Sequence, residues 1–145
     1  MKLSLSPWIC WALLSAIFAA LTAVLAKVGL ENIHSDFATF LRTIVVVIIL
    51  GCILVFTGQW QPLQDISSKT YLFLTLSGIC TGASWVCYFR ALKLGDAARV
   101  APVDKLSVVI VALLSVAFLG ERLVLLNWIG IVLIAAGVIF VTCKS

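Results

Sequence analysis

The sequence predicts an all-α fold, a polytopic membrane bundle of five transmembrane helices that forms one domain over residues 1–145. Of the 145 residues, 63% are hydrophobic and 11% are charged, whereas a soluble domain is roughly half apolar and about a quarter charged. The apolar residues form continuous runs, unlike the alternating segments of about 10 residues that build a transmembrane β-barrel. The same composition excludes a disordered chain and a nucleic-acid-binding module.

Five stretches are long and apolar enough to cross a bilayer, which takes about 20 residues in a helix. We place them at Pro7–Ala26, Phe37–Thr57, Tyr71–Leu92, Val100–Leu119 and Leu123–Cys143. The first stretch follows Lys2 like a signal peptide, but its apolar part exceeds the usual length of about 7–15 residues, so we expect a retained anchor. The last two spans should be antiparallel neighbours, because only Gly120-Glu121-Arg122 separates them.

Lys and Arg are distributed unequally between the two sides of the membrane. Five spans place the two termini on opposite sides, and the side of the amino terminus holds three of these residues: Lys2, Lys69 and Arg122. The other side holds seven: Lys27, Arg42, Arg90, Lys93, Arg99, Lys105 and Lys144. Because Lys and Arg concentrate in cytoplasmic segments, this bias predicts an outside amino terminus and a cytoplasmic carboxyl terminus. Insertion in both orientations is the less favoured alternative.

The fourth span brings charged residues toward the membrane. Its uninterrupted apolar run, Leu106–Leu119, has 14 residues, which is roughly 21 Å of helix against a hydrocarbon core of roughly 30 Å. The helix must therefore extend back to about Val100, and this places Pro102, Asp104 and Lys105 below the membrane boundary. A charge at that depth is costly unless it faces protein, water or an opposite charge. Asp104 and Lys105 then form part of a substrate or coupling site.

The alternative is that Asp104 and Lys105 lie at the interface, with Lys105 reaching toward water. Adjacent residues point about 100° apart around a helix, so we expect the two side chains to have separate environments. For Asp104 we expect a cationic partner, with three candidates: Lys27, Arg42 and Arg90.

The second and third spans hold further candidates. Gly78 and Gly82 form a G-x-x-x-G pattern, which permits close helix packing in lipid. Trp85 and Tyr88 have polar groups that need partners, so they line either a cavity or an interfacial aromatic belt. Arg42 lies about five residues into its span and needs a carboxylate or water; the candidates for its partner are Glu31 and Asp36.

Catalytic and metal-binding patterns are not visible in the sequence. There is no Ser/His/Asp arrangement and no phosphate-binding glycine loop. The five cysteines lie in apolar spans without a C-x-x-C pair, and the single histidine, His34, lies in a loop. We therefore expect no enzyme activity, no cofactor and no metal site.

Several short stretches resemble the EamA domain of the drug/metabolite transporter superfamily, over nearly the whole chain. The stretches are residues 84–95 (SWVCYFRALKLG), residues 100–107 (VAPVDKLS) and residues 119–121 (LGE). Gly130 and Gly137 continue the pattern, and we expect them to be helix-packing positions. The resemblance implies a single EamA-like five-helix domain, one repeat of the two that larger members carry in inverted orientation.

The resemblance implies transport of a small organic metabolite across a bacterial-type inner membrane. The expected partners are the substrate, the lipid bilayer and a second copy of the chain. Inverted repeats would require antiparallel copies, whereas the charge bias favours one orientation, and both arrangements stay open. The alternative function is a non-transporting structural or helper membrane protein. Relatives among the four-helix small multidrug resistance proteins have a glutamate in their first helix, which is absent from Trp8–Ala26 here.

The topology prediction can be tested with reporter fusions at Ser145. Because the Lys and Arg bias is seven to three, nearly all molecules should report a cytoplasmic carboxyl terminus. An even division of the reporter between the two sides would contradict the prediction and support dual topology.

Overall fold

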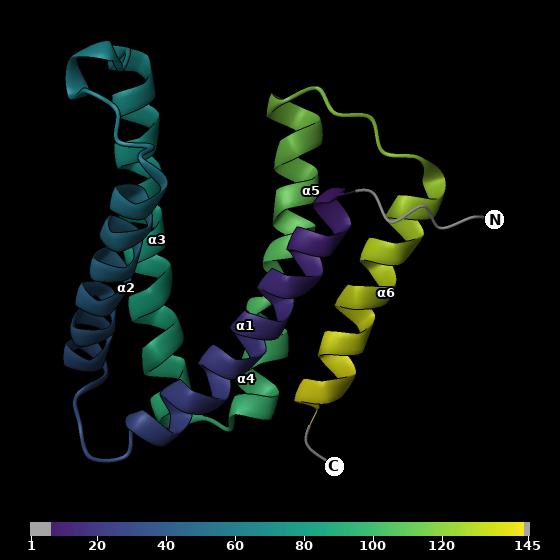
Figure 1. Cartoon of the computed structure of the whole chain (residues 1–145). Coiled ribbons are helices and arrows are strands. Elements are labelled where there is room, and N and C mark those ends of the chain that lie inside the picture. Colours follow the sequence, from purple (N-terminus) through teal and green to yellow (C-terminus); the bar gives the residue numbers. More distant parts are fainter. Residues whose placement is uncertain (1–6, 144–145) are drawn as a thin grey trace. The chain divides into compact units, whose positions relative to one another are not determined.

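The computed structural model describes residues 7–143, and all regular elements in that range are helices. In chain order they are α1 (Pro7–Gly29), α2 (Ser35–Thr57), the short 3-10 helix η1 (Leu63–Asp65), α3 (Ser68–Leu94), α4 (Ala97–Asp104), α5 (Ser107–Phe118) and α6 (Leu125–Thr142) (Figure 1). Two residues counted in the topology prediction, Lys2 and Lys144, lie outside the described range.

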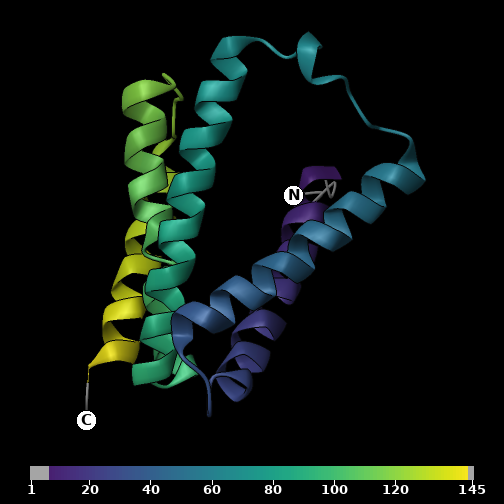
Figure 2. The same cartoon turned by 90° about the vertical axis from the view of Figure 1, so that its left-hand side faces the viewer.

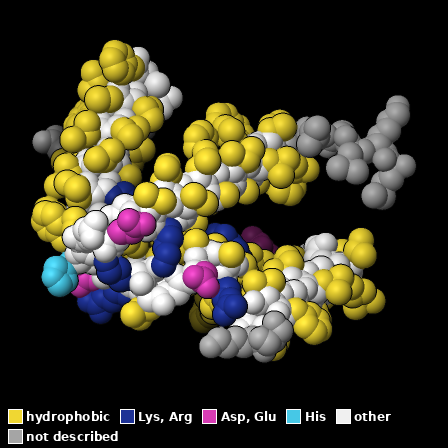
Figure 3. Space-filling view, turned by 90° about the horizontal axis from the view of Figure 1, so that it is seen from below, with side chains coloured by type: hydrophobic (Ala, Val, Ile, Leu, Met, Phe, Trp, Pro, Cys, Tyr) yellow, Lys and Arg dark blue, Asp and Glu magenta, His cyan; other side chains and the backbone are white. Residues whose placement is uncertain are grey.

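The five predicted spans are confirmed. The helical segments long and apolar enough to cross a membrane are α1, α2, α3, the α4–α5 segment Ala97–Phe118, and α6. The first three extend two or three residues beyond the predicted boundaries at one or both ends, because polar residues such as Ser35 and Ser68 continue the helices into the interface. Figure 3 shows hydrophobic side chains over the flanks of the helices, as lipid contact requires, and charged side chains near helix ends.

The fourth span is two helices rather than the one continuous helix that the sequence suggests. The break lies at Lys105 and Leu106, where the backbone tightens to a 3-10 pattern. The N–H of Lys105 donates to the carbonyl of Pro102 and that of Leu106 to the carbonyl of Val103, both at 3.0 Å. Pro102 inside α4 acts on the turn before it, because it lacks an N–H and crowds the carbonyl four residues earlier, so it does not account for this break.

The chain divides into two compact units, and the first comprises residues 7–24 and 95–143 of the described range. In this unit α6 contacts both α4 and α5. Helix α5 is followed by Gly120, whose φ of +67° lies in the left-handed region that glycine adopts without strain. The chain then returns to start α6 at Leu125, so α5 and α6 are antiparallel neighbours, as predicted from the short connection (Figure 1).

The second unit comprises residues 25–94 and is built on the antiparallel pair α2 and α3. Helix α2 ends at Gly58, which has a φ of +65° and donates its N–H back to the carbonyl of Val55 at 3.3 Å. The two helices meet where α2 begins and α3 ends, and they diverge toward the connection at residues 58–67 (Figure 2).

Two lysines join the ends of α1 and α3 in the second unit. The ammonium of Lys27, in the last turn of α1, donates to the carbonyl oxygen of Leu92 at 2.8 Å. The ammonium of Lys93, in the last turn of α3, donates to three carbonyl oxygens of the segment after α1: those of Leu30, Glu31 and Ile33. Leu30 and Leu92 are 2% and 0% exposed beneath these bonds. The Leu92 carbonyl belongs to the last turn of α3, where a helix leaves carbonyls without partners, and the other three carbonyls belong to the connection after α1.

We expect Lys93→Met to destabilise this junction while preserving the apolar stem of the side chain. The variant removes the donor of three carbonyl groups that water can partly rehydrate, so the free energy of unfolding should fall by about 1 kcal/mol. The measurement is the midpoint of thermal unfolding in detergent.

The matched control is Lys69→Met, because Lys69 is an exposed lysine in the first turn of α3 with no hydrogen bond to the described residues. Equal midpoints for the two variants would show that the three carbonyl contacts contribute nothing to stability.

Candidate functional site

An ion pair fixes the end at which α2 and α3 meet. Arg90 donates from Nε to Oδ1 of Asp36 at 2.9 Å and from Nη2 to Oδ2 at 2.6 Å. This two-bond geometry holds a guanidinium and a carboxylate in one plane. Asp36 lies in the first turn of α2, and Arg90 lies about one turn before the end of α3.

The suggestion that Asp36 is the partner of Arg42 is wrong, because the structure pairs Asp36 with Arg90. The reason is position along the helices. Arg90 is level with the first turn of α2, whereas Arg42 lies nearly two turns further in. The sequence contains a signal for the observed pair: antiparallel neighbours bring the start of the second span beside the end of the third, and these ends carry opposite charges.

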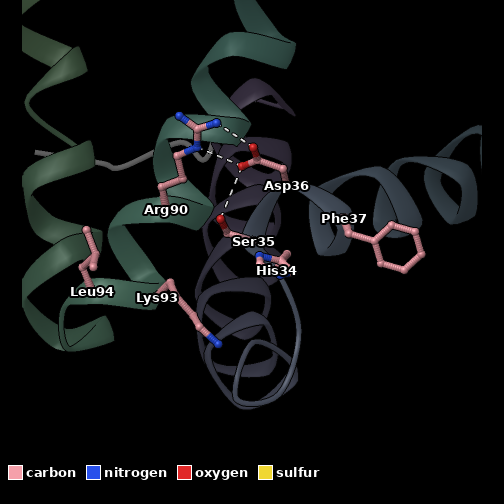
Figure 4. Close-up of a pocket in the computed structure, with 7 residues that line it drawn as sticks. All are labelled: His34, Ser35, Asp36, Phe37, Arg90, Lys93 and Leu94. Carbon is pink, nitrogen blue, oxygen red and sulfur yellow. Dashed lines mark hydrogen bonds and ion pairs between the residues drawn. The ribbon is translucent and has the colours of Figure 1, made fainter.

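A cavity of about 640 Å³ lies beside this ion pair. Its lining combines the start of α2 with the end of α3: His34, Ser35, Asp36, Phe37, Arg90, Lys93 and Leu94 (Figure 4). Figure 4 shows the Arg90 guanidinium and the Asp36 carboxylate facing each other, whereas the ring of Phe37 points away from them. The polar groups at this end are therefore largely engaged with one another.

Arg42 and Trp85, both predicted as binding residues, lie against each other in the second unit. The guanidinium carbon of Arg42 is 4.4 Å from the centre of the Trp85 ring and 5.5 Å from the centre of the Phe89 ring. Helix α2 supplies the cation and α3 supplies both rings, which are one turn apart. A cation over an aromatic face at this range is attracted by the negative face of the ring. The structure brings the two residues together, and their role in binding remains a prediction.

The guanidinium of Arg42 lies further along the α2–α3 pair than the Asp36–Arg90 ion pair does. Arg42 is six residues beyond Asp36, and Trp85 is five residues before Arg90, which are about 9 Å and 7.5 Å of helix at 1.5 Å per residue. The guanidinium lies closer to Trp85 than to Phe89, which is nearer the helix end. The side chain thus crosses to α3 instead of reaching toward the interface.

Tyr88 lies beside the rings that contact Arg42. It is half-buried, and its ring is 6.4 Å from the Phe89 ring in an edge-on arrangement. The structure therefore places it near the predicted binding residues of α2 and α3. Its role as a substrate-binding residue remains a prediction.

A groove of about 610 Å³ occupies the space where α2 and α3 diverge. One carboxylate, four hydroxyl residues, two glycines and four apolar or aromatic side chains line it: Asp36, Thr39, Phe40, Thr43, Leu74, Ser77, Gly78, Thr81, Gly82, Trp85 and Val86. Three of the hydroxyls donate to carbonyls of their own helix: Thr39 to Ser35 at 2.9 Å, Thr43 to Thr39 at 2.7 Å and Thr81 to Ser77 at 2.9 Å. Their oxygens remain as hydrogen-bond acceptors.

The predicted packing glycines leave open space around them in the structure. A Cβ atom built at Gly78, Gly82, Gly130 or Gly137 meets no atom of the described chain within 4 Å. Gly78 and Gly82 instead contribute to the groove. A close helix approach at these positions would have to come from another molecule, so their packing role remains a prediction.

Asp104 and Lys105 lie at the break between α4 and α5 in the first unit. The expectation of separate environments is wrong, because the ammonium of Lys105 lies 3.3 Å from Oδ2 of Asp104. The flexible four-carbon stem lets Lys105 fold back onto the carboxylate that precedes it. Both residues remain candidates for a substrate or coupling site.

In the part of the chain that the structure describes, no three His, Cys, Asp or Glu side chains are grouped to hold a metal ion.

Comparison with known proteins gives a family match over almost the whole chain. The sequence profile of the EamA-like transporter family matches residues 6–143. A Sinorhizobium protein described as an uncharacterized transporter in the cobO 3' region is 63% identical over 130 residues, which are 90% of this chain and 92% of that protein. The uncharacterized transporter YxxF of Bacillus subtilis (strain 168) is 31% identical over 130 residues, covering 89% of this chain and 40% of that protein. No solved structure has significant similarity to the chain.

The ion pair between α2 and α3 can be tested by exchanging its charges. Asp36→Asn and Arg90→Gln should each lower the thermal midpoint, because each leaves the other charge without its partner. The double variant Asp36→Arg/Arg90→Asp should restore most of the loss, and it preserves the number of positive charges on that side of the membrane. A double variant no more stable than either single variant would show that the pair does not couple the two helices.

Proposed function

We propose that this chain, which belongs to the EamA-like transporter family, carries a small organic metabolite across the membrane. Its five apolar helical segments make it a multi-pass membrane protein. The family and the names of both relatives support a transporter rather than an enzyme. We place it in a bacterial-type inner membrane with the amino terminus outside.

The groove between α2 and α3 is the observation that supports a substrate site in this chain. Its volume of about 610 Å³ lies within the range of about 300–1,000 Å³ typical of small-molecule sites. Hydroxyl oxygens and the indole of Trp85 provide polar groups on an apolar lining, a combination that orients a small molecule. We assign substrate contact to Trp85, Tyr88 and Arg42.

We propose further that two copies form the working carrier. The chain spans 40% of the Bacillus relative, and transporters that contain internal repeats place the substrate site between them. The open surroundings of Gly78 and Gly82 would admit a helix of a second copy. Asp104 and Lys105 are the proposed coupling residues, because broken helices provide substrate and ion sites in many transporters.

Filling the groove should stop transport without unfolding the chain. We expect Gly78→Leu and Gly82→Leu to lower substrate flux at least tenfold, because the added side chains enter space that the structure leaves open. Gly51→Leu is the matched control: Gly51 also has open surroundings but lies in α2 outside the groove lining. Membrane-inserted yield should be equal for all three variants.

The substrate for this measurement comes from comparing metabolites in cells with and without the protein, followed by uptake of isotope-labelled candidates into proteoliposomes. Oligomer size measured on the same samples separates a blocked groove from a lost dimer. Absence of flux for every candidate, with correctly inserted protein, would favour the non-transporting helper instead. Flux that is equally low in the Gly51→Leu control would remove the groove from the proposal.

A further inference from the structure

We infer that Arg42 binds a carboxylate group of the transported molecule, so that the substrate is a small organic anion. This inference rests on the proposed transport function and names the substrate class of the same site. It starts from the contacts of the Arg42 guanidinium, which lies 4.4 Å from the Trp85 ring centre and 5.5 Å from the Phe89 ring centre. Aromatic contacts engage the face of a guanidinium, and its N–H groups, which point outward in the plane, remain for an anion.

The carboxylates of the second unit do not neutralise Arg42. Residues 25–94 contain three of them: Glu31, Asp36 and Asp65. Asp36 is bound by Arg90 through both of its oxygens. Asp65 lies in η1, at the far end of α2, and Glu31 lies in the turn before α2. Within this unit, the structure therefore gives Arg42 aromatic contacts and no ion pair.

A cation held at this depth has a strong preference for an anionic partner. Charges within the membrane normally pair, face water or mark the path of a substrate. Arg42 does not reach toward the interface, because its guanidinium is closer to Trp85 than to Phe89. The rings also restrict the orientation of the guanidinium, so less conformational freedom is lost when its N–H groups bind a carboxylate in the two-bond geometry.

Trp85 connects this cation to the groove, because it contacts Arg42 and also lines the groove. A molecule bound by its carboxylate at Arg42 can therefore extend past Trp85 toward Thr39, Thr43 and Thr81. The protons of these three hydroxyls are used within their own helices, so their oxygens present acceptors to the groove. The uncharged part of the substrate should thus carry hydrogen-bond donors.

The test uses the fluorescence of Trp85 in the full chain, with the four other tryptophans replaced: Trp8→Phe, Trp11→Phe, Trp60→Phe and Trp128→Phe. Three probes of similar shape and different charge are titrated into protein in nanodiscs: benzoate, benzamide and benzylammonium. We expect a saturable change with benzoate and at least tenfold weaker responses with the other two. Equal responses to benzoate and benzamide would overturn the inference, and this comparison needs no change at Arg42.

Variants at Arg42 then test whether this residue causes the preference for benzoate. Arg42→Gln should weaken benzoate binding at least tenfold. The affinity of Arg42→Lys for benzoate should lie between those of the parent and the Gln variant, because lysine keeps the charge without the planar fork. Arg122→Gln is the control for loss of an exposed arginine, and its affinity for benzoate should equal that of the parent protein. Benzoate selectivity that survives in a folded Arg42→Gln protein would overturn the inference. So would binding that appears only after Asp104→Asn, because Asp104 would then be the anion that occupies Arg42.

Flux measurements separate this inference from the proposed function. Flux of a carboxylate metabolite that is lost in the Arg42→Gln variant would support both the transport function and the anion site. Flux of neutral or cationic metabolites alone, with no response of Trp85 to benzoate, would leave the transport function standing and overturn the anion site. Charge-selective benzoate binding without flux of any metabolite would support the anion site and contradict the transport function.

Discussion

The ion pair between Asp36 and Arg90 sets the electrostatics of the whole α2–α3 unit. By binding both oxygens of Asp36, Arg90 uses the one carboxylate that α2 carries. It also joins the start of α2 to the end of α3, and with the helices paired at this level Arg42 lies opposite Trp85. Arg42 is therefore a cation within a spanning helix that contacts aromatic rings, and one of these rings, Trp85, also lines the groove. Asp36 is the one carboxylate within α2 and α3, so its pairing with Arg90 leaves Arg42 without an acidic partner on these two helices.

The lysine contacts at the same end reinforce that register without using any carboxylate. Lys27 and Lys93 direct their ammonium groups to backbone carbonyls at the ends of α3 and α1. Helix termini carry partial negative charge, so a cation is stabilised there even in the absence of an acidic side chain. The same two residues are among the seven positive charges that predict which side faces the cytoplasm. Two residues that contribute to the topology prediction thus also donate to backbone carbonyls at helix junctions.

The sequence predicted the five spans well because the signal for a spanning helix is local, a run of about 20 apolar residues. The break at Lys105 and Leu106 was missed, since Pro102 near the start of a span fits an ordinary helix start. Arg42 and Trp85 were each selected for their chemistry, but their contact could not be predicted. Such a contact depends on the level at which two helices pair, and the observed level also brings together Asp36 and Arg90, residues 54 positions apart in the chain. The groove follows from the divergence of α2 and α3, which no residue pattern specifies.

The sign of a fixed charge in a membrane site constrains the sign of the cargo. In a medium of low dielectric, a charge is stabilised by a partner of opposite sign far more strongly than in water, and a like charge is excluded. Here the first helix, Pro7–Gly29, has no acidic residue, and the charge at depth is the arginine of α2 beside Trp85. The carboxylate that we infer at Arg42 has the sign that this arginine favours.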